Sequence, residues 1–333
     1  MSNPQKRIIV CGLGSIGRKH VRLLQQQFPQ TKIAALRSGK GLSYVSEEPT
    51  LDDQFYSIDE AINWSPDGVI IASPASCHIQ QALVFAAAGI PLLIEKPLGT
   101  GLEDEKDLNY LQKLSASVPI LVGYILRYDS SLNWVKDQLN QLRLGSNIIE
   151  ADFYCGSWLP DWRPDSNYIN GVSARRELGG GSLLELSHEL DLALWLLSTE
   201  ITILSAVATR SSLLKVDVED QVISLAQTND STLITFRLNY CSQPPRRTVL
   251  VRSNEGELDC DILAQSARLN YSSTASASLT FSSSDAPDLR HCLQHKHFFA
   301  CIDRKELPLC TVADGLAVLR MVRGICELAD YLC

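Results

Sequence analysis

The feature that most constrains the fold of this chain is a glycine-rich turn near its N-terminus. The apolar run Ile8 to Cys11, typical of a buried strand, leads directly into Gly12-Leu13-Gly14-Ser15-Ile16-Gly17, and a helical pattern follows from Arg18 to Phe28. In such a strand–turn–helix unit the glycines permit a tight turn, close approach of a pyrophosphate and close helix packing. The alternative is a glycine turn without a ligand. We predict a dinucleotide site whose contacts are Gly12, Gly14, Ser15, Ile16 and Gly17.

The end of the second predicted strand, Lys32 to Leu36, indicates which dinucleotide is preferred. Where an acidic residue usually binds the ribose hydroxyls of NAD, the sequence has Arg37, followed by Ser38 and, nearby, Lys40. A guanidinium pairs well with a 2′-phosphate, and no carboxylate stands beside it to repel one. We therefore expect NADP in preference to NAD, with Arg37 and Ser38 as contacts. Stacking of Arg37 on the adenine is the alternative, and it leaves both cofactors open.

Another predicted strand, residues 68–72, is followed by a polar loop. Ser73 and Pro74 come directly after it, and His78 opens the next helix. Because ligands bind at the carboxyl ends of strands in an open α/β sheet, we expect these three residues beside the cofactor. Capping of the helix is an equally good role for His78.

The strand at residues 90–94 ends in Glu95-Lys96-Pro97. A lysine at the mouth of a crevice can have its pKa lowered toward the working pH by partial burial. Pro97 restricts the backbone just after it, and a cis Lys–Pro bond would aim the lysine side chain. The alternative is a solvated lysine before a turn. We predict Glu95 as a cofactor contact and Lys96 as a cofactor-binding and catalytic residue.

The order of the predicted elements indicates two domains, as expected for 333 residues. Strands and helices alternate up to Gly123, which predicts a Rossmann-type, parallel, doubly wound sheet in an NAD(P)-binding domain, residues 1–123. Beyond it strands follow one another, including 216–227, which predicts an α+β domain with a mostly antiparallel open sheet, residues 124–333. We expect that domain to bind substrate and to form oligomers. Two helices, 289–301 and 314–332, close it.

A leucine-rich stretch in the second domain is predicted to form one buried helix. It follows Gly179-Gly180-Gly181 and runs to Leu197. Glu185, His188 and Asp191 fall at three-residue steps, so one helical stripe would place a carboxylate on either side of the histidine. A histidine flanked in this way exchanges a proton near neutral pH. The alternatives are a core histidine or a metal ligand, but a second histidine is missing and we expect no metal.

An irregular segment before this helix is rich in aromatic residues and arginines. Flat rings and guanidinium donors suit sugar rings and anionic groups, whereas packing between domains is the alternative role. The predicted substrate contacts of this segment are Trp158, Trp162, Arg163, Tyr168 and Arg175.

Composition excludes several other functions. The net charge of −8 gives no pull toward nucleic acid or anionic membranes, and no apolar run is long enough to span a bilayer. The N-terminus has no signal-peptide core. Ten cysteines are scattered without any Cys-x-x-Cys pair, which fits free thiols in a reducing cytoplasm.

Together these segments resemble the Gfo/Idh/MocA family, named after glucose–fructose oxidoreductase, inositol dehydrogenase and a rhizopine catabolism protein. The resemblance covers both domains. It is carried by Gly12 to Gly17, Ala72-Ser73-Pro74 with His78, Glu95-Lys96-Pro97, Gly123-Tyr124 with Arg127, Gly179 to Gly181, His188 to Asp191, and Asp314 to Val318. It implies an NAD(P)-dependent oxidoreductase acting on a sugar, cyclitol or nucleotide-linked sugar, with Lys96 handling the substrate and His188 catalytic. Arg127 and Asp191 are added to the expected substrate contacts.

The sequence departs from the family at one position. Many members have an aspartate four residues before the histidine, where this chain has Leu184. Either Glu185 supplies the acid, or Lys96 and His188 handle the proton alone. The segments 158–164 and 187–191 look like a subgroup associated with surface-sugar biosynthesis. A non-catalytic NADP-binding sensor is the alternative function, and the family resemblance implies a homodimer or homotetramer.

Overall fold

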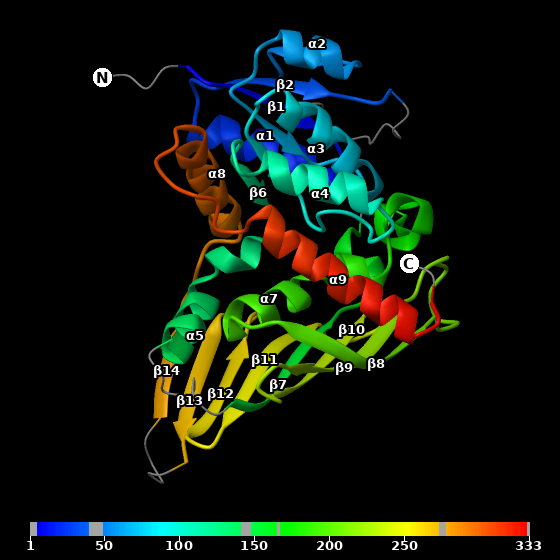
Figure 1. The fold of residues 1–333 in the computed structure, drawn as a ribbon, viewed down its shortest axis with the longest axis vertical. Coiled ribbons are helices and arrows are strands. Elements are labelled where there is room, and N and C mark those ends of the chain that lie inside the picture. Colours follow the sequence, from blue (N-terminus) through cyan, green and yellow to red (C-terminus); the bar gives the residue numbers. More distant parts are fainter. Residues whose placement is uncertain (1–4, 40–48, 141–147, 165–166, 273–277, 332–333) are drawn as a thin grey trace. The chain divides into compact units, whose positions relative to one another are not determined.

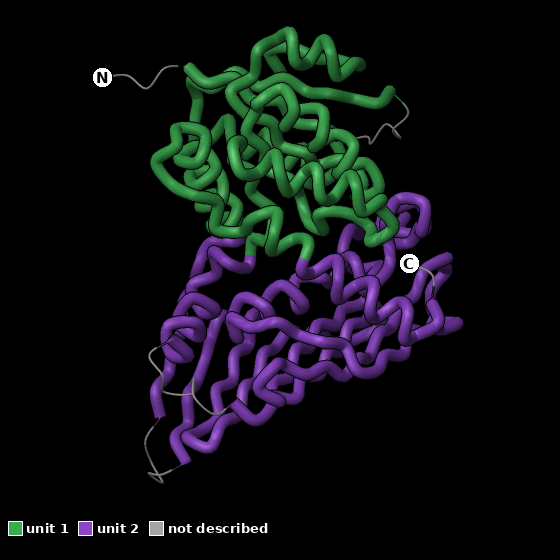
Figure 2. The backbone as a smooth tube through the Cα atoms, viewed as in Figure 1, with its two compact units in different colours: residues 1–125, 288–316 green, residues 126–287, 317–333 purple. Residues whose placement is uncertain are grey.

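The computed structural model describes residues 5–39, 49–140, 148–164, 167–272 and 278–331. The chain forms two compact units (Figure 2). The first combines residues 1–125 with 288–316, and the second combines residues 126–287 with 317–333. Lys40, named above as a neighbour of the cofactor phosphate, lies outside the described residues.

The first unit is built on a six-stranded parallel sheet with the order β3-β2-β1-β4-β5-β6 (Figure 1). This order confirms the predicted doubly wound sheet. The short edge strand β3 has no apolar run and was not predicted. The strands are β1 (Arg7–Cys11), β2 (Lys32–Leu36), β3 (Asp53–Phe55), β4 (Gly68–Ile71), β5 (Leu92–Ile94) and β6 (Ile120–Val122).

Helices cover both faces of this sheet, because right-handed crossovers that start in the middle and run in opposite directions place them on opposite sides. The helix α1 (Ser15–Gln27) contacts α8 (Leu289–Ile302), and α3 (His78–Ala87) contacts α4 (Glu105–Leu114). The remaining helix, α2 (Ile58–Asn63), contacts β3. With both faces covered, the strands read as continuous apolar runs: four residues of β1 and all four of β4 are buried.

The helix α8, which precedes the last helix of the chain, lies in the first unit although its residues belong to the stretch that we assigned to the second domain. The ring of Phe299 stacks on Phe28 at the end of α1, with centroids 4.2 Å apart. Gly68 at the start of β4 leaves room for Phe298 and Ile302, since a Cβ there would meet both side chains. These contacts join segments more than 200 residues apart, so sequence periodicity identified the helix but not its sheet.

The second unit contains an eight-stranded sheet with the order β14-β13-β12-β11-β7-β10-β9-β8. Among the described strands of this sheet, β7 and β10 alone pair in parallel, and this confirms the prediction of a mostly antiparallel sheet. The strands are β7 (Ile148–Gly156), β8 (Ile201–Thr209), β9 (Gln221–Thr228), β10 (Leu233–Asn239), β11 (Arg246–Ser253), β12 (Gly256–Asp261), β13 (Ser266–Tyr271) and β14 (Ser278–Ser282).

Two strand predictions in this sheet need correction. The prediction of a strand from Val216 was wrong in its start, because β9 begins only at Gln221. The backbone N–H of Lys215 donates to the Tyr168 hydroxyl and that of Asp217 to the Ala174 carbonyl, so neither pairs with a strand. The strand β13 was missed, since its polar alternation is too short to distinguish from a loop.

One face of the second sheet is covered by helices. The helix α5 (Ser130–Asn140) contacts β12 to β14, α7 (His188–Leu197) contacts β7, and α6 (Ser182–Glu185) contacts β9 and β10 (Figure 1). The last helix, α9 (Val312–Leu328), belongs to both units. Alternation along the strands leaves Val207, Ile223 and Leu233 on the other face, where they are 60%, 57% and 43% exposed.

The expectation of free thiols holds for most of the cysteines that the structure describes. The free ones are Cys11, Cys77, Cys155, Cys241, Cys260, Cys292, Cys301 and Cys310. Cys326 in α9 is disulfide-bonded, which corrects the expectation at this position. Isolated cysteine spacings carry no information about which residues meet in the fold.

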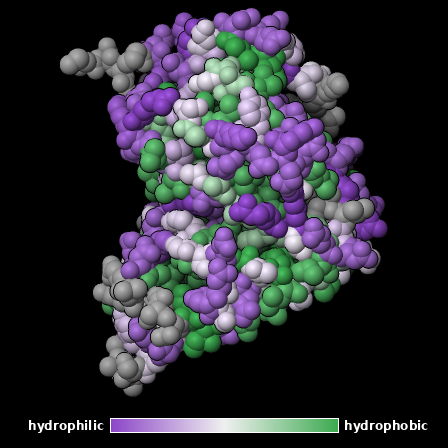
Figure 3. Space-filling view, in the orientation of Figure 1, coloured by the Kyte–Doolittle hydropathy of each residue, from purple (hydrophilic) through white to green (hydrophobic). Residues whose placement is uncertain are grey.

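In the described part of the chain no helix combines the length and apolar character needed to cross a membrane. On the face drawn in Figure 3, hydrophilic side chains are interspersed with hydrophobic ones over both units.

We expect Gly17→Ala to destabilise the first unit much more than Gly14→Ala. A Cβ at Gly17 would overlap the Gly12 carbonyl oxygen, whereas a Cβ at Gly14 meets nothing within 4 Å. Forced overpacking of this kind typically costs about 1–3 kcal/mol. Thermal unfolding of the two variants, followed by circular dichroism, measures the difference. Equal melting temperatures for both would contradict the close contact.

Candidate functional site

The glycine turn lies where sequence analysis placed it, at the carboxyl end of β1. Gly12 has a φ of +87°, which favours glycine, and a Cβ there would lie 3.0 Å from the Ala72 carbonyl oxygen and from Ser73. The loops after β1 and β4 are therefore in contact. Gly14 is the N-cap of α1, without a side-chain cap and without an acidic residue in the first turn. A helix N-terminus of this kind binds anions such as phosphate groups.

His78 links two loops at this edge of the sheet. Its Nε2 lies 2.8 Å from the Ser73 carbonyl oxygen, and its Nδ1 lies 2.8 Å from that of Pro97. The ring is buried, and desolvation lowers its pKa more than the two carbonyl bonds raise it, so a neutral ring donates to one carbonyl. The side chain does not cap its helix. Its contact with a cofactor stays a prediction.

The Ser73 hydroxyl is also used within the unit, because it donates to the Gln81 side chain over 2.8 Å. Together with His78 this bond fixes the loop that follows β4. The backbone of Ser73 and Pro74 remains the part of this loop that we predict to contact a cofactor.

Glu95 and Lys96 follow β5, which pairs with β4 so that Ile94 lies beside Ile71. Glu95 is buried, and its Oε1 accepts from Nε2 of His20 over 2.9 Å while its Oε2 accepts from the Lys96 backbone N–H over 3.2 Å. Burial raises the carboxyl pKa, but the hydrogen bond from His20 and the nearby positive charge together outweigh it, so the pKa lies below its ordinary value. The Lys96–Pro97 bond is cis. Sequence analysis did not anticipate His20 as the partner of Glu95.

Arg37 follows β2, at the strand end where the adenosine ribose was expected. Its backbone N–H donates to the Phe55 carbonyl, and its Nη1 donates to Oε1 of Gln54 over 3.2 Å. Ser38 beside it is exposed. The structure therefore brings Arg37 and Ser38 together at the end of the strand next to β1.

The prediction of a single leucine-rich helix between Ser182 and Leu197 was wrong. The structure has α6, which ends at Glu185, and α7, which begins at His188. At the break Leu186 has ψ of 22°, and Glu189 N–H bonds to Leu186 O, a tighter three-residue turn. Glu185 therefore does not continue the stripe of His188 and Asp191, and the argument that it substitutes on the same helical face does not hold.

Two buried ion pairs lie close to His188 in sequence, since both of their carboxylates follow it within three residues. Arg127 donates from Nη2 to Oδ1 of Asp191 over 2.6 Å and from Nε to both carboxylate oxygens. Glu189 accepts from Nε of Arg247 over 2.6 Å and from Nη2 over 3.1 Å. His188 itself is 9% exposed. Arg127 and Asp191, both predicted as substrate contacts, are thus paired with each other.

Arg247 had no sequence signal, because it lies in a strand 58 residues from Glu189 with no motif around it. The predicted substrate role of Arg127 and Asp191 stays a prediction.

The aromatic segment is partly engaged within the second unit. Trp162 Nε1 donates to the Ser157 hydroxyl over 2.7 Å, and its ring meets that of Tyr240 edge to face. The Tyr168 hydroxyl accepts from Lys215, and Arg175 pairs with Glu177. Trp158 is half-buried and Arg163 is exposed. These contacts give Trp162 and Tyr168 packing roles within the second unit, whereas the alternative named above was packing between domains.

Glu219 is a buried acid that sequence analysis missed. Its Oε1 accepts from the Leu183 backbone N–H over 2.8 Å, and burial raises its pKa to about 7. Gly181, with a φ of +113°, leaves the space that the carboxyl group occupies. This contact explains the last glycine of the Gly179 to Gly181 run. A single glutamate within the predicted strand 216–227 gives no sequence signal of its own.

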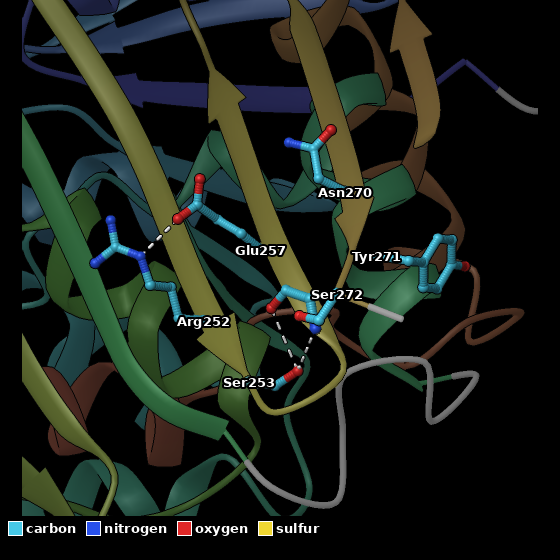
Figure 4. Close-up of a pocket in the computed structure, with 7 residues that line it drawn as sticks. Arg252, Ser253, Glu257, Asn270, Tyr271 and Ser272 are labelled. Atoms are coloured by element: carbon cyan, nitrogen blue, oxygen red, sulfur yellow. Dashed lines mark hydrogen bonds and ion pairs between the residues drawn. The ribbon is translucent and has the colours of Figure 1, made fainter. Parts of the chain in front are cut away.

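A surface hollow of about 350 Å³ lies at the tips of β11 to β13 (Figure 4). Arg252 there pairs with Glu257 and Glu150, so its charge is already neutralised. None of the predicted site residues lines it, and we do not regard it as the candidate site. The described residues contain no group of three or more side chains suited to a metal ion.

Comparisons with known proteins agree with this arrangement. A family model described as the oxidoreductase family with an NAD-binding Rossmann fold matches residues 6–123, and a GFO/IDH/MocA C-terminal domain matches residues 149–259. The chain is 28% identical to inositol 2-dehydrogenase 2 of Saccharopolyspora erythraea over 69% of its own length and 65% of that protein's. It therefore spans less than two thirds of this relative.

Two solved structures share the fold over nearly the whole chain. The myo-inositol 2-dehydrogenase of Lactobacillus plantarum superposes with a TM-score of 0.79 at 18% identity, covering 98% of this chain and 97% of that one. The WlbA dehydrogenase of Bordetella pertussis, solved with NADH and UDP-GlcNAcA, gives 0.78 at 18% identity with the same coverage. Since models of both family domains match in order, the chain belongs to the Gfo/Idh/MocA family of oxidoreductases.

Proposed function

We propose that this protein is an NAD(P)-dependent oxidoreductase that transfers hydride between nicotinamide and a hydroxyl or carbonyl carbon of a sugar, cyclitol or nucleotide-linked sugar. The observation that carries the proposal is the position of Lys96. It follows β5 beside a buried carboxylate, on the sheet edge that also carries the glycine turn. The family membership and the names of the relatives support the same substrate class.

The residues of the first unit fit a dinucleotide. The uncapped N-terminus of α1 and the open space at Gly14 suit a pyrophosphate, with Gly12, Ser15, Ile16 and Gly17 completing the turn. Arg37 and Ser38 would hold the adenosine ribose, and Ser73, Pro74, Glu95 and Lys96 the nicotinamide half. The bound cofactor supplies or accepts the hydride.

In the proposed reaction Lys96 hydrogen-bonds the reacting oxygen of the substrate. Either Lys96 or His188 carries the proton that leaves or joins this oxygen. The break between α6 and α7 favours these two residues alone over a contribution from Glu185, since Glu185 lies on a different helix from His188. The non-catalytic sensor has no specific observation in its favour.

For the cofactor we propose NADP in preference to NAD. The support is the charge at the end of β2, where Arg37 is followed by Ser38 and no carboxylate group stands at either position. The Arg37 side chain donates to the Gln54 amide over 3.2 Å, which holds the guanidinium at this end of β2.

We also propose a homodimer or homotetramer that forms through the uncovered face of the second sheet. Val207 and Ile223 lie opposite each other on neighbouring strands of this face and are largely exposed. Exposed apolar patches of this kind mark association surfaces.

Lys96→Ala should lower turnover by about 10²- to 10⁴-fold, because a positioned acid or base typically contributes that much. Cofactor affinity should stay nearly unchanged. The assay follows nicotinamide absorbance with NADP and NAD against free sugars, inositols and UDP-, GDP- and CMP-linked sugars. Lys106→Ala, which removes an exposed lysine of α4, is the matched control. Full activity of the Lys96 variant would contradict the catalytic role proposed for Lys96.

Arg37→Gln should weaken NADP binding by about 10- to 100-fold and leave NAD binding nearly unchanged, since a hydrogen bond to a charged group contributes about 1.5–3 kcal/mol. Fluorescence titration with both reduced cofactors measures the effect. Lys32→Gln removes a positive charge at the opposite end of β2 and serves as control. An equal loss for NADP and NAD would contradict the phosphate contact.

Ile223→Glu should shift the protein toward a monomer, because a charge at the centre of an apolar contact is costly to bury. Light scattering after size-exclusion chromatography measures the mass. Leu307→Glu, at a leucine that is 88% exposed in the first unit, is the control and should keep the wild-type mass. A monomeric wild-type protein would refute the proposal itself.

A further inference from the structure

A buried polar cluster lies between α1 and α8 in the first unit. His20 and His295 are 0% exposed, and His20 contacts Glu95 on one side and His295 on the other. The distances are 2.9 Å from His20 Nε2 to Glu95 Oε1 and 2.7 Å from His20 Nδ1 to His295 Nε2. Gln27 Nε2 lies 3.3 Å from His295 Nδ1. Glu95 is a proposed cofactor contact, whereas His20, His295 and Gln27 have no part in the proposed binding of cofactor or substrate.

The cluster forms an ordered chain of hydrogen bonds. An ionised Glu95 only accepts, so His20 must donate from Nε2, and a neutral His20 then accepts at Nδ1. His295 must therefore donate from Nε2 and accept at Nδ1, where the Gln27 amide supplies the donor. Every bond in the chain is satisfied when both rings are neutral. The second oxygen of Glu95 accepts from the Lys96 backbone N–H, so the chain ends at Lys96.

The charges around the cluster agree with this proton arrangement. On α1 the nearest is Lys19, which pairs with Asp288 at the start of α8 together with Arg22. On α8 His291 meets the His20 ring edge to face, and burial lowers its pKa to about 4. Burial also holds the pKa of His295 well below its ordinary value.

An apolar contact between α1 and α8 would avoid the free energy of desolvating polar groups. Buried polar groups stabilise a fold only when every one of them is paired. The chain of hydrogen bonds instead fixes one donor, Nε2 of His20, against Glu95. That bond and the Lys96 N–H hold the carboxylate on two sides, so removal of His20 frees it to turn or to take up a proton.

We propose that His20, oriented by His295, is a positioning residue for Lys96, acting through the carboxylate of Glu95. The inference rests on the proposed function, because it assigns a role in hydride transfer to residues that touch neither cofactor nor substrate. Displacing a reacting group by about 1 Å can cost 10²-fold in rate, so the expected effect is on kcat.

The kinetic test compares His20→Leu, His20→Gln and His295→Leu. His20→Leu should lower kcat by about 10- to 100-fold with cofactor Kd and thermal stability close to wild type. The amide of His20→Gln can donate to Glu95 at the place of Nε2 and should restore most of kcat. His297→Leu removes a histidine of α8 whose Nε2 bonds to Leu307 O, outside the cluster, and is the control. A purely structural role predicts a joint loss of kcat, affinity and stability, with His20→Gln no better than His20→Leu, and would overturn the inference.

A second measurement needs no substrate and no variant. Nitrogen NMR of histidine-labelled protein at pH 7.5 should show neutral His20 and His295 rings, both carrying the proton on Nε2. A charged ring, or a proton on Nδ1 of His20, would overturn the ordered chain. Activity retained in Lys96→Ala overturns the proposed function, whereas wild-type kcat in His20→Leu together with an inactive Lys96→Ala overturns this inference alone.

Discussion

The close approach of the α1 backbone to the turn after β1 is the contact on which the first unit depends. Gly17 touches the Gly12 carbonyl, and Gly12 in turn touches the loop after β4. Any side chain at these points would push the helix from the sheet. The contact places the N-terminus of α1, the β4 loop and the Lys96 loop on one edge, and an edge of this kind is where a doubly wound sheet binds its ligands.

Glycine plays the same part twice more around the proposed site. Gly123 lies against the backbone of Glu95 and Lys96, where a Cβ would come within 2.9 Å of the Glu95 Cα. The absence of a side chain at Gly181 leaves space for the carboxyl group of Glu219. At Gly123 the missing side chain lets two backbone segments approach each other, and at Gly181 it lets a carboxyl group lie against the backbone.

Buried charges in this protein are paired over long distances along the chain. Arg127 with Asp191 and Glu189 with Arg247 form two ion pairs close to His188 in sequence, and the hydrogen bond from His20 holds Glu95 just before Lys96. Buried pairs contribute little net stability, since desolvation offsets their attraction, but removing one partner leaves the other charge buried and unpaired. Their effect is to fix the positions of the backbone segments that carry the two proposed proton carriers.

The sequence by itself determined the βαβ units, the glycine turn and the strand ends, because these depend on residues within about 30 positions of one another. It predicted the helix α8 but not its place on α1, and it read α6 and α7 as one helix because leucine periodicity runs through the break. Only the tertiary structure decided that Arg127 pairs with Asp191 and that His295 reaches His20, 275 residues away. Hydrogen bonds and ion pairs between distant segments follow from how sheets and helices pack, and no local pattern encodes that packing.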